Sequence, residues 1–254
     1  MFSLKEKVAV VTGGGRGIGE GIARVLSGQG AIVCIADLLI DEAQRTAQEI
    51  ETAGGKALAI QTDVTRIESV RGMLDKVHET FGPVDILVNN AGWDKMAPFS
   101  ETTPDLWEKI IAINYKGVLN CVYVVMHDMI SRNDGRIISI GSDAGRVGSS
   151  GEAVYAGTKG AIISFSKSMA RELARHGVKI NVVCPGPTET HLAQEMKQES
   201  ELNRKIWAGM EKIIPLRRMG TPEEIGSAVA FLSSEEAGFI TGQVLSVSGG
   251  LTMV

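Results

Sequence analysis

The stretch "VAVVTGGGRGIGEGIARVL", residues 8–26, decides the fold of this chain. A short β-branched segment runs directly into clustered glycines, and an amphipathic helical pattern follows. Glycines at such a junction allow a tight turn and close packing of the helix on the strand. A buried strand, a turn and a helix in this order form the first unit of a parallel α/β sheet.

The same alternation continues along the chain. Strand-like runs occur at 8–12, 32–37, 57–60, 84–89, 136–140, 179–184 and 243–248. Their near-continuous apolar character is typical of strands buried on both faces. Amphipathic helical segments that end at glycines lie at 19–30, 40–55 and 67–82. We therefore expect an α/β fold, a doubly wound parallel sheet of seven strands with helices on both faces, in one domain over residues 1–254. Residues 188–214, after the sixth strand, are a predicted substrate lid.

The composition is that of an ordinary globular domain, with 44% hydrophobic residues, 22% charged residues and a net charge of −4. This charge predicts no nucleic-acid partner. The cysteines lie far apart without metal-ligand spacing, so we expect a reducing compartment, no disulfide framework and no metal. No signal-peptide pattern and no run of 18 apolar residues occurs, which predicts a cytoplasmic protein without membrane contact.

The glycine-rich turn is a candidate phosphate-binding loop, with a G-x-x-x-G-x-G spacing at Gly13, Gly17 and Gly19. Such a turn directs backbone N–H groups and the positive end of a helix dipole at a pyrophosphate. Asp37 ends the second strand, where a carboxylate can bind a ribose diol and repel a 2′-phosphate. Arg16 could favour that phosphate, but Leu38, not a cation, follows Asp37. The pattern favours NAD over NADP; the alternatives are a turn without a ligand and an Asp37 that only caps the next helix.

Further motifs stand in register with this turn. They are "DV" (63–64), "NNAG" (89–92), "AINYKG" (112–117), "SDAGRVGSSGEAVYAGTKG" (142–160) and "PG" (185–186). In their order and spacing, over essentially the whole chain, they resemble the classical short-chain dehydrogenases/reductases. The resemblance implies a Rossmann-type domain, an NAD-dependent oxidoreductase acting on CH–OH groups, and a homotetramer.

The resemblance also implies roles for individual residues. It implies a catalytic tetrad of Asn114, Ser142, Tyr155 and Lys159. It implies cofactor contacts from the first two strands and their turns, at Gly13, Arg16, Gly17, Ile18, Gly19, Asp37 and Leu38. The remaining implied cofactor contacts are Asp63, Val64, Asn90, Ala91, Gly92, Tyr155, Lys159, Pro185, Gly186, Thr188 and Thr190. Thr188 departs from the family, which often has an aliphatic residue there, so we expect its backbone N–H to serve the carboxamide.

Tyr155 and Lys159 are spaced i and i+4 on a helix predicted to begin near Glu152, and therefore share a face. A phenol titrates near pH 10, and a neighbouring ammonium stabilises its charged form. Tyr155 is thus the expected general base for a secondary hydroxyl. In the family arrangement Ser142 hydrogen-bonds the substrate oxygen, and Asn114 holds a water that links Lys159 to solvent. The alternative is a surface helix with an exposed Tyr and Lys.

A closer resemblance, to family members that oxidise cyclic β-hydroxyacyl-CoA thioesters in aromatic degradation, is carried by "NNAGWD" (89–94), "SDAGRVGSSGEAVYA" (142–156), "CPGPTET" (184–190) and "GFITGQVLSVSGGLTM" (238–253). It implies an acyl-CoA substrate contacted by Trp93, Asp143, Ser142 and Tyr155, with Asp94 able to reach the mouth of the site. Candidate partners for coenzyme A phosphates are Lys95, Arg146, Lys197, Arg204, Lys205, Arg217 and Arg218. The alternatives are a 3-oxoacyl thioester reductase, another secondary-alcohol dehydrogenase, and a non-catalytic NAD-binding structural subunit.

Overall fold

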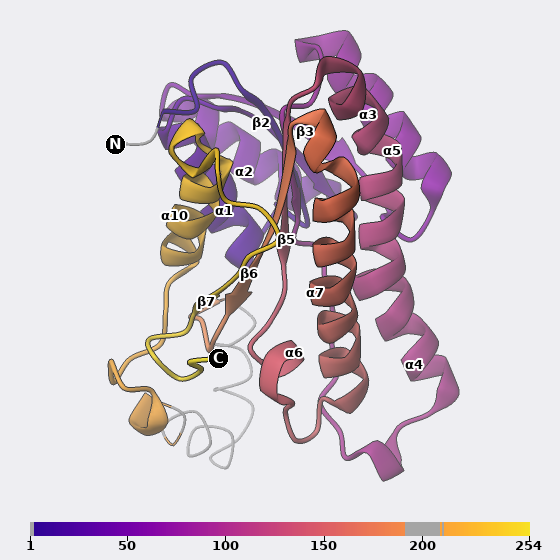
Figure 1. The fold of residues 1–254 in the computed structure, drawn as a ribbon, viewed down its shortest axis with the longest axis vertical. Helices are drawn as coiled ribbons and strands as arrows, with labels where there is room; N and C mark the ends of the chain where they lie inside the picture. The colour runs from indigo at the N-terminus through magenta and orange to yellow at the C-terminus, as the bar shows by residue number, and fades with distance from the viewer. Residues whose placement is uncertain (1–2, 191–208, 210) are drawn as a thin grey trace.

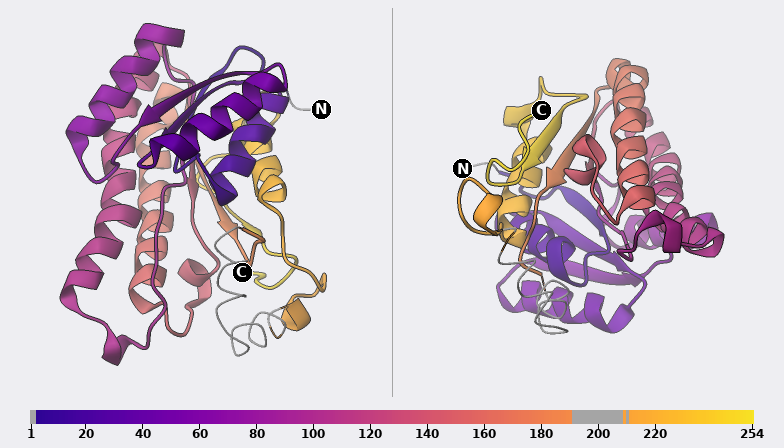
Figure 2. Two further views of the ribbon diagram at one scale, coloured as in Figure 1. Left: turned by 180° about the vertical axis from the view of Figure 1, so that it is seen from behind. Right: turned by 90° about the horizontal axis from the view of Figure 1, so that it is seen from below.

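The computed structural model describes residues 3–190, 209 and 211–254, and seven parallel strands form its centre (Figures 1 and 2). They are β1 (Val8–Thr12), β2 (Ile32–Asp37), β3 (Lys56–Gln61), β4 (Ile86–Asn89), β5 (Gly135–Ile140), β6 (Val178–Pro185) and β7 (Val244–Val247). Their order across the sheet is β3-β2-β1-β4-β5-β6-β7. The predicted doubly wound sheet is confirmed, and each predicted strand lies within two residues of the observed bounds.

The described helices cover both faces of this sheet. They are α1 (Gly17–Gly28), α2 (Ile40–Thr52), α3 (Ile67–Phe81), α4 (Pro104–Ile111), α5 (Gly117–Arg132), α6 (Ala144–Val147), α7 (Ala153–Leu173) and α10 (Pro222–Ser233). Single turns are η1 (Phe99–Glu101), the π-helical η2 (Ala112–Lys116), η3 (Ala174–His176) and η4 (Glu235–Ala237). Gly30 and Gly82, which follow α1 and α3, have φ of +93° and +90°. This confirms the prediction that glycines end these helices.

The period-two alternation of β1 divides the core into two layers. Ala9 and Val11 belong to the cluster formed with α1, α2 and α10. Val8 and Val10 belong to the cluster formed with α3, α5 and α7 on the opposite face. Figure 1 shows α1, α2 and α10 on one side of the sheet and α3, α5 and α7 on the other. Burial on both faces explains why the strands are apolar throughout.

The longest continuous helical stretch, residues 104–132, joins α4, η2 and α5 and has the length and apolar composition of a membrane span. Part of its apolar surface instead faces the core. Val118, Val122, Val125 and Met129 are buried in the cluster that packs on the sheet. Within the part of the chain that the structure describes, this stretch is therefore accounted for as a core helix.

The direction of winding changes between β1 and β4, which are neighbours in the sheet although β2 and β3 intervene in the chain. In open α/β sheets, ligands bind at the carboxyl ends of the strands on either side of such a switch point. Of the predicted lid, residues 191–208 and 210 lie outside the described residues. Its described start is fixed by a β-bridge between Thr188 and Gly220.

Candidate active site

The glycine-rich turn lies at the carboxyl end of β1 and is shaped by close packing. Gly13 has a φ of +61° and Gly17 a φ of +59°, in the left-handed region that favours glycine. A Cβ atom on Gly13 would lie 2.9 Å from Ala91 Cα, and one on Gly19 would lie 2.0 Å from Gly13 O. These glycines therefore let the turn, α1 and the segment after β4 approach one another.

The N-terminus of α1 faces this turn, and no described side chain caps it. Its first N–H groups lack partners within the helix and carry the positive end of the dipole. Ile18 packs its side chain into the core, and Arg16 is exposed. A Cβ atom on Gly17 would approach Thr190, at 3.6 Å, among the described residues. The end of α1 therefore suits a pyrophosphate group, which fits the expected dinucleotide cofactor.

Asp37 ends β2, beside the same turn. Its Oδ2 accepts a 2.9 Å hydrogen bond from Gly15 N, and its Oδ1 accepts a 3.0 Å bond from Leu39 N. Asp37 thus holds two turns by their backbone, and it does not cap α2, whose N-cap residue is Leu39 and has no side-chain cap. A carboxylate has about four acceptor positions, so acceptors remain for a ribose diol. Leu38 is 59% exposed beside it, which leaves this end of the site open.

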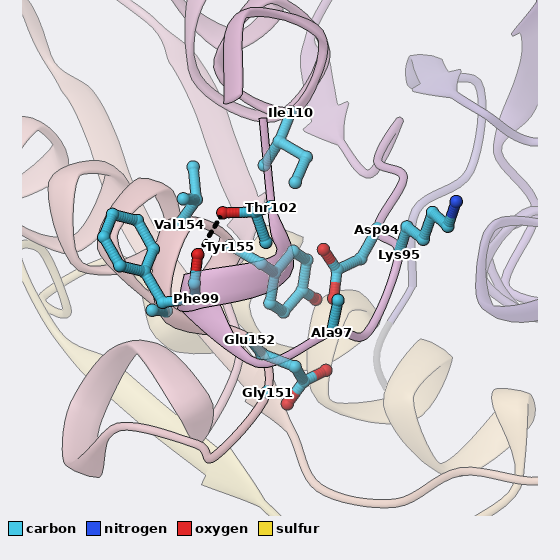
Figure 3. A pocket seen from close by; sticks show the side chains of 11 residues that line it. Asp94, Lys95, Ala97, Phe99, Thr102, Ile110, Gly151, Glu152, Val154 and Tyr155 are labelled. Atoms are coloured by element: carbon cyan, nitrogen blue, oxygen red, sulfur yellow. Dashed lines mark hydrogen bonds between the residues drawn. The ribbon is translucent and has the colours of Figure 1, made fainter. Parts of the chain in front are cut away.

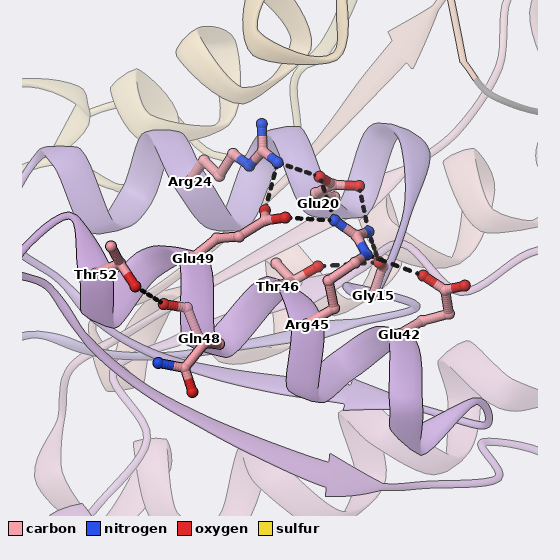
Figure 4. A network of polar contacts seen from close by, with 9 residues as sticks. All are labelled: Gly15, Glu20, Arg24, Glu42, Arg45, Thr46, Gln48, Glu49 and Thr52. Carbon is pink, nitrogen blue, oxygen red and sulfur yellow. Dashed lines mark hydrogen bonds and ion pairs between the residues drawn. The ribbon is translucent and has the colours of Figure 1, made fainter.

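A network of ionic contacts fastens the turn to α2 (Figure 4). Gly15 O accepts hydrogen bonds from Arg45 Nη2 at 2.9 Å and Thr46 Oγ1 at 3.0 Å. Hydrogen bonds with Glu20 raise the pKa of Arg45. The charged groups are largely exposed, so their ion pairs add little to the free energy of unfolding. Their role is to position the glycine-rich turn on α2. The other members of the network are Arg24, Glu42 and Glu49.

Thr12 joins the turn to the "NNAG" segment across the switch point. Its Oγ1 accepts from Asn90 N at 3.0 Å and Ala91 N at 3.1 Å, and donates to Val88 O at 3.3 Å. Asn90 Nδ2 donates to Thr12 O and to Gly13 O. Sequence reasoning missed Thr12; its place directly before the glycines was the available signal.

Asp63 and Val64, the expected adenine contacts, lie just beyond the carboxyl end of β3 and form a turn of their own. Asp63 Oδ1 accepts from Thr65 N at 2.9 Å and from Thr65 Oγ1 at 2.7 Å. Val64 is buried, and its carbonyl accepts from Asn120 Nδ2 at 2.8 Å. Their contact with adenine stays a prediction.

Asn114 lies in the π-helical turn η2 and is fully buried. Such turns inside helices are frequent at functional sites. Its Nδ2 donates to Trp93 O at 2.6 Å and to Ile110 O at 2.9 Å, and its Oδ1 accepts from Trp93 N at 3.2 Å. Both amide donors are thus used, and one acceptor position remains for the expected water. A Cβ atom on Gly92 would lie 2.9 Å from Asn114 Oδ1. Glycine at position 92 therefore leaves room for the amide oxygen of Asn114.

Lys159 is buried in α7, and its Nζ donates a 2.8 Å hydrogen bond to Ile140 O at the end of β5. Burial lowers the pKa of Lys159 to about 8. The ammonium lies 5.5 Å from the centroid of the Tyr155 ring. The predicted pairing of Tyr155 and Lys159 on one face of a helix is therefore present, and the alternative of two exposed side chains is wrong.

Tyr155 and Ser142 come together between α7 and the end of β5. Burial is the main influence on Tyr155 and raises its pKa; the charge of Glu152 raises it further, and a hydrogen bond with Ser142 lowers it. In the ligand-free protein burial outweighs the influences that lower this pKa, and the expected lowering by Lys159 together with a bound nicotinamide stays a prediction. Ser142 Oγ accepts from Ala144 N at 3.1 Å, which orients the hydroxyl.

Trp93 and Asp143, the other two expected substrate contacts, have side chains that already contact neighbouring residues. Lys109 Nζ lies 3.7 Å over the Trp93 ring. The Asp143 side chain is buried, and its Oδ1 accepts from Ser246 Oγ at 2.5 Å. Asp143 therefore connects α6 to β7 in this structure, and its role toward substrate stays a prediction.

The segment after β6 is also held by its own contacts. Pro185 O accepts from Asp143 N at 3.2 Å, and Gly186 N donates to Val247 O at 3.1 Å. Thr188 turns its hydroxyl back onto Gly186 O, at 2.9 Å. The Thr188 side chain is thus engaged, so its expected contribution to a cofactor falls to the backbone.

Three of the candidate phosphate-binding cations already have partners. Arg146 donates to Ser246 Oγ at 2.8 Å, and Arg218 forms two hydrogen bonds with Glu224. Arg217 donates to Lys212 O, and Lys95 is exposed. Lys197, Arg204 and Lys205 lie outside the described residues.

Two carboxylates line a small pocket with Tyr155 (Figure 3): Asp94, which was expected only at the mouth of the site, and Glu152, which the sequence had not assigned to the site. Glu152 is the residue before α7 and precedes Tyr155 by one helical turn. That i, i+3 spacing was a signal for Glu152 in the sequence. Asp94 follows "NNAG", and only the fold brings it to Tyr155.

The arrangement combines an acid–base group, an oxygen-binding hydroxyl and a buried cation at the carboxyl edge of a dinucleotide-binding sheet. Such a set suits proton transfer to or from a carbinol oxygen beside a hydride acceptor.

Comparison with known proteins agrees with this chemistry. Residues 13–252 match a family model described as enoyl-(acyl carrier protein) reductase. The chain is 41% identical over 254 residues to the 3-oxoacyl-[acyl-carrier-protein] reductase FabG of Escherichia coli, covering 100% of both chains. It is 38% identical over 256 residues to the oxidoreductase UcpA of Salmonella typhimurium, covering 100% of this chain and 97% of the relative. The chain is therefore an oxidoreductase acting on CH–OH groups, and it belongs to the classical short-chain dehydrogenase/reductase family.

Proposed function

We propose that this protein is an NAD-dependent dehydrogenase that oxidises the secondary hydroxyl of a β-hydroxyacyl-CoA, with a cyclic acyl group such as 2-hydroxycyclohexane-1-carbonyl-CoA. The oxidation rests on one observation, the meeting of Tyr155 and Ser142 beside Lys159 at the end of β5. The thioester rests on the resemblance of residues 89–94, 142–156 and 184–190 to 2-hydroxycyclohexane-1-carbonyl-CoA dehydrogenase.

Each residue has a defined task in this reaction. Tyr155 takes the proton of the substrate hydroxyl as the C–H bond of the carbinol carbon breaks and a carbonyl forms. Ser142 hydrogen-bonds the substrate oxygen in both its hydroxyl and carbonyl forms. Lys159 keeps a positive charge near the phenolate that develops. A bound nicotinamide dinucleotide would supply the hydride acceptor. The carboxyl edge of the sheet around α1, Asp37 and Asn90 would hold this dinucleotide.

The choice of NAD rests on Asp37. Its carboxylate is fixed by Gly15 N and Leu39 N, so it cannot turn away from an adenosine ribose without breaking both bonds. A fixed negative charge there opposes a 2′-phosphate. Cytoplasmic location, a homotetramer and a place in aromatic degradation complete the proposal.

The second candidate is a reductase of 3-oxoacyl thioesters. The 41% identity to FabG over the whole chain favours it. The same residues serve both directions, since Tyr155 then donates the proton that it otherwise accepts. Substrate and direction therefore separate the two candidates, and the tetrad does not.

A substrate panel tests the proposal. Formation of NADH is followed by absorbance with 2-hydroxycyclohexanecarbonyl-CoA, a linear 3-hydroxyacyl-CoA, the free β-hydroxy acid and a simple secondary alcohol, and each is repeated with NADP⁺. We expect the highest kcat/KM for the cyclic thioester with NAD⁺. A simple alcohol or free acid that equals the thioesters overturns the acyl-CoA assignment. A preference for reducing acyl-carrier-protein thioesters selects the second candidate.

A further inference from the structure

The pocket beside Tyr155 carries two carboxylates from different parts of the chain. Asp94 belongs to the segment after β4, and Glu152 immediately precedes α7. Both line the pocket together with the Tyr155 ring, and Figure 3 shows their carboxylates near the phenol hydroxyl. Its remaining walls are largely apolar and include Ala97, Phe99, Ile110 and Val154.

The Asp94 carboxylate is not neutralised within this pocket. Its Oδ2 is buried and has no hydrogen-bond partner among the described residues. Lys95 also lines the pocket, but Figure 3 shows its ammonium directed away from Tyr155. Lys159 donates to Ile140 O, and Lys109 lies over Trp93. No described cation pairs with Asp94, so the pocket carries negative charge beside the phenol that is to exchange a proton with the substrate hydroxyl.

The pKa values of these groups agree with this geometry. Burial raises the pKa of Asp94 to about 6, and the charge of Glu152 contributes to the rise. Both carboxylates raise the pKa of Tyr155, after the larger effect of burial. The two carboxylates thus oppose a third negative charge in the same pocket.

We propose that Asp94 and Glu152 are specificity-determining residues that reject substrates with a negative charge next to the reacting hydroxyl and admit neutral acyl derivatives. The inference rests on the proposed function, and it names the feature of the substrate that this site recognises. A thioester is neutral at its carbonyl carbon, two carbons from the carbinol carbon, whereas the free β-hydroxy acid is a carboxylate there. The phosphates of coenzyme A lie many bonds away, so they are compatible with such a filter. Repulsion of an unwanted ligand is a common source of specificity.

The test uses pairs of substrates that differ in this charge and contain no coenzyme A. The cyclic pair is methyl 2-hydroxycyclohexanecarboxylate and its free acid. The linear pair is methyl 3-hydroxybutyrate and its free acid. The ratio of kcat/KM for acid over ester is measured in the unaltered enzyme and in Asp94→Asn, Glu152→Gln and the double variant. Each replacement keeps the side-chain shape and removes a charge. Glu101→Gln, an exposed carboxylate in η1, is the matched control.

We expect each single variant to raise the acid-to-ester ratio about tenfold, which is the effect of one pKa unit of charge coupling. The double variant should raise it further, and Glu101→Gln should leave it unchanged. An unchanged ratio in the double variant, with turnover of the ester retained, overturns the inference. Because Glu152 makes no side-chain cap to α7, its replacement should not disturb folding.

A pH series on the unaltered enzyme gives the same answer without a variant. The groups that face Asp94 are Glu152 and Tyr155 on α7 and the neighbouring Lys95. Between pH 7.5 and 5.5, Asp94 gains a proton while a substrate carboxylate of ordinary pKa, about 4, stays ionised. The acid-to-ester ratio should therefore rise as the pH falls, and a constant ratio contradicts the inference.

Failure of the proposed function has a different signature. If the CoA thioester is no better than its methyl ester, the acyl-CoA proposal fails, whereas the shift in the acid-to-ester ratio can still occur. If the thioester is preferred but the ratio does not respond to either carboxylate, the charge filter alone is wrong.

Discussion

Lys159 Nζ donates a 2.8 Å hydrogen bond to Ile140 O, and this contact joins the second turn of α7 to the last residue of strand β5. The ammonium is thereby held 5.5 Å from the centre of the Tyr155 ring. At that separation it acts on the phenol through its charge and not through a hydrogen bond to the ring. Burial still dominates the pKa of Tyr155, so the protein needs further positive charge near the phenol to form a phenolate.

Tyr155→Phe keeps the ring and removes the proton carrier. We expect kcat to fall by about 100- to 10,000-fold, the range typical for loss of a positioned acid–base group. Cofactor affinity, measured by the quenching of protein fluorescence, should change little. Near-normal turnover in this variant contradicts the assignment of Tyr155 as the base. Tyr123→Phe, at an exposed position of α5, is the control.

Lys159→Met should abolish most activity and yet stabilise the ligand-free protein at pH 7. The folded-state pKa of Lys159 is about 8, below the unfolded value near 10.4, so the charged form opposes folding at pH 7. As pH rises through 8 the folded protein loses this proton first, and the penalty disappears toward pH 10. The methionine variant should therefore gain up to about 3 kcal/mol at pH 7 and less than about 1 kcal/mol at pH 10. Urea unfolding of the variant and the unaltered protein at both pH values measures the gain in the free energy of unfolding. An equal gain at both pH values shows that it does not come from the charge of Lys159.

Asp37→Ala should narrow the preference for NAD over NADP, because the negative charge opposite a 2′-phosphate is removed. It should also lower the free energy of unfolding by about 1–3 kcal/mol, because Gly15 N and Leu39 N lose their acceptor. Asp41→Asn removes another negative charge, at an exposed position in the first turn of α2. It should change neither the cofactor preference nor the free energy of unfolding. Equal use of both cofactors by the unaltered enzyme overturns the assignment, and Arg16 then becomes the candidate phosphate partner.

Thr12→Val preserves shape and deletes the hydroxyl that ties the glycine turn to Asn90 and Ala91. Two N–H groups then lose their partner at a buried position, at a cost of about 1–3 kcal/mol each. We expect urea unfolding to show this loss and cofactor affinity to fall with it. Thr80→Val, which removes an exposed hydroxyl bonded within α3, should be nearly neutral. Similar stability of both variants contradicts the role given to Thr12.

Asp94→Asn should move the rising limb of the pH–rate profile for alcohol oxidation to lower pH. The carboxylate of Asp94 raises the pKa of Tyr155, so its removal lowers the pH at which the phenolate forms. The profile of kcat/KM for a neutral ester measures this shift in the free enzyme. A limb that stays in place shows that Asp94 and Tyr155 are not coupled.

Much of the fold was predictable because it depends on local chemistry. The apolar strands, the glycines after α1 and α3, and the turn at 13–16 each require particular residues at particular spacings. The i, i+4 relation of Tyr155 and Lys159 follows from helix geometry alone. These features need no knowledge of distant contacts.

The sequence by itself determined the alternation of strands and helices, the dinucleotide-type turn and the identity of the residues able to move a proton. Only the tertiary structure decided their electrostatics and their free hydrogen-bonding groups. Asn114 spends both amide donors on Trp93 and Ile110, Asp143 turns to Ser246, and Asp94 comes to lie beside Tyr155. The reason is physical: a pKa and an unused hydrogen-bond position depend on burial and on neighbours from other segments, and these exist only after β4, β5 and α7 pack together.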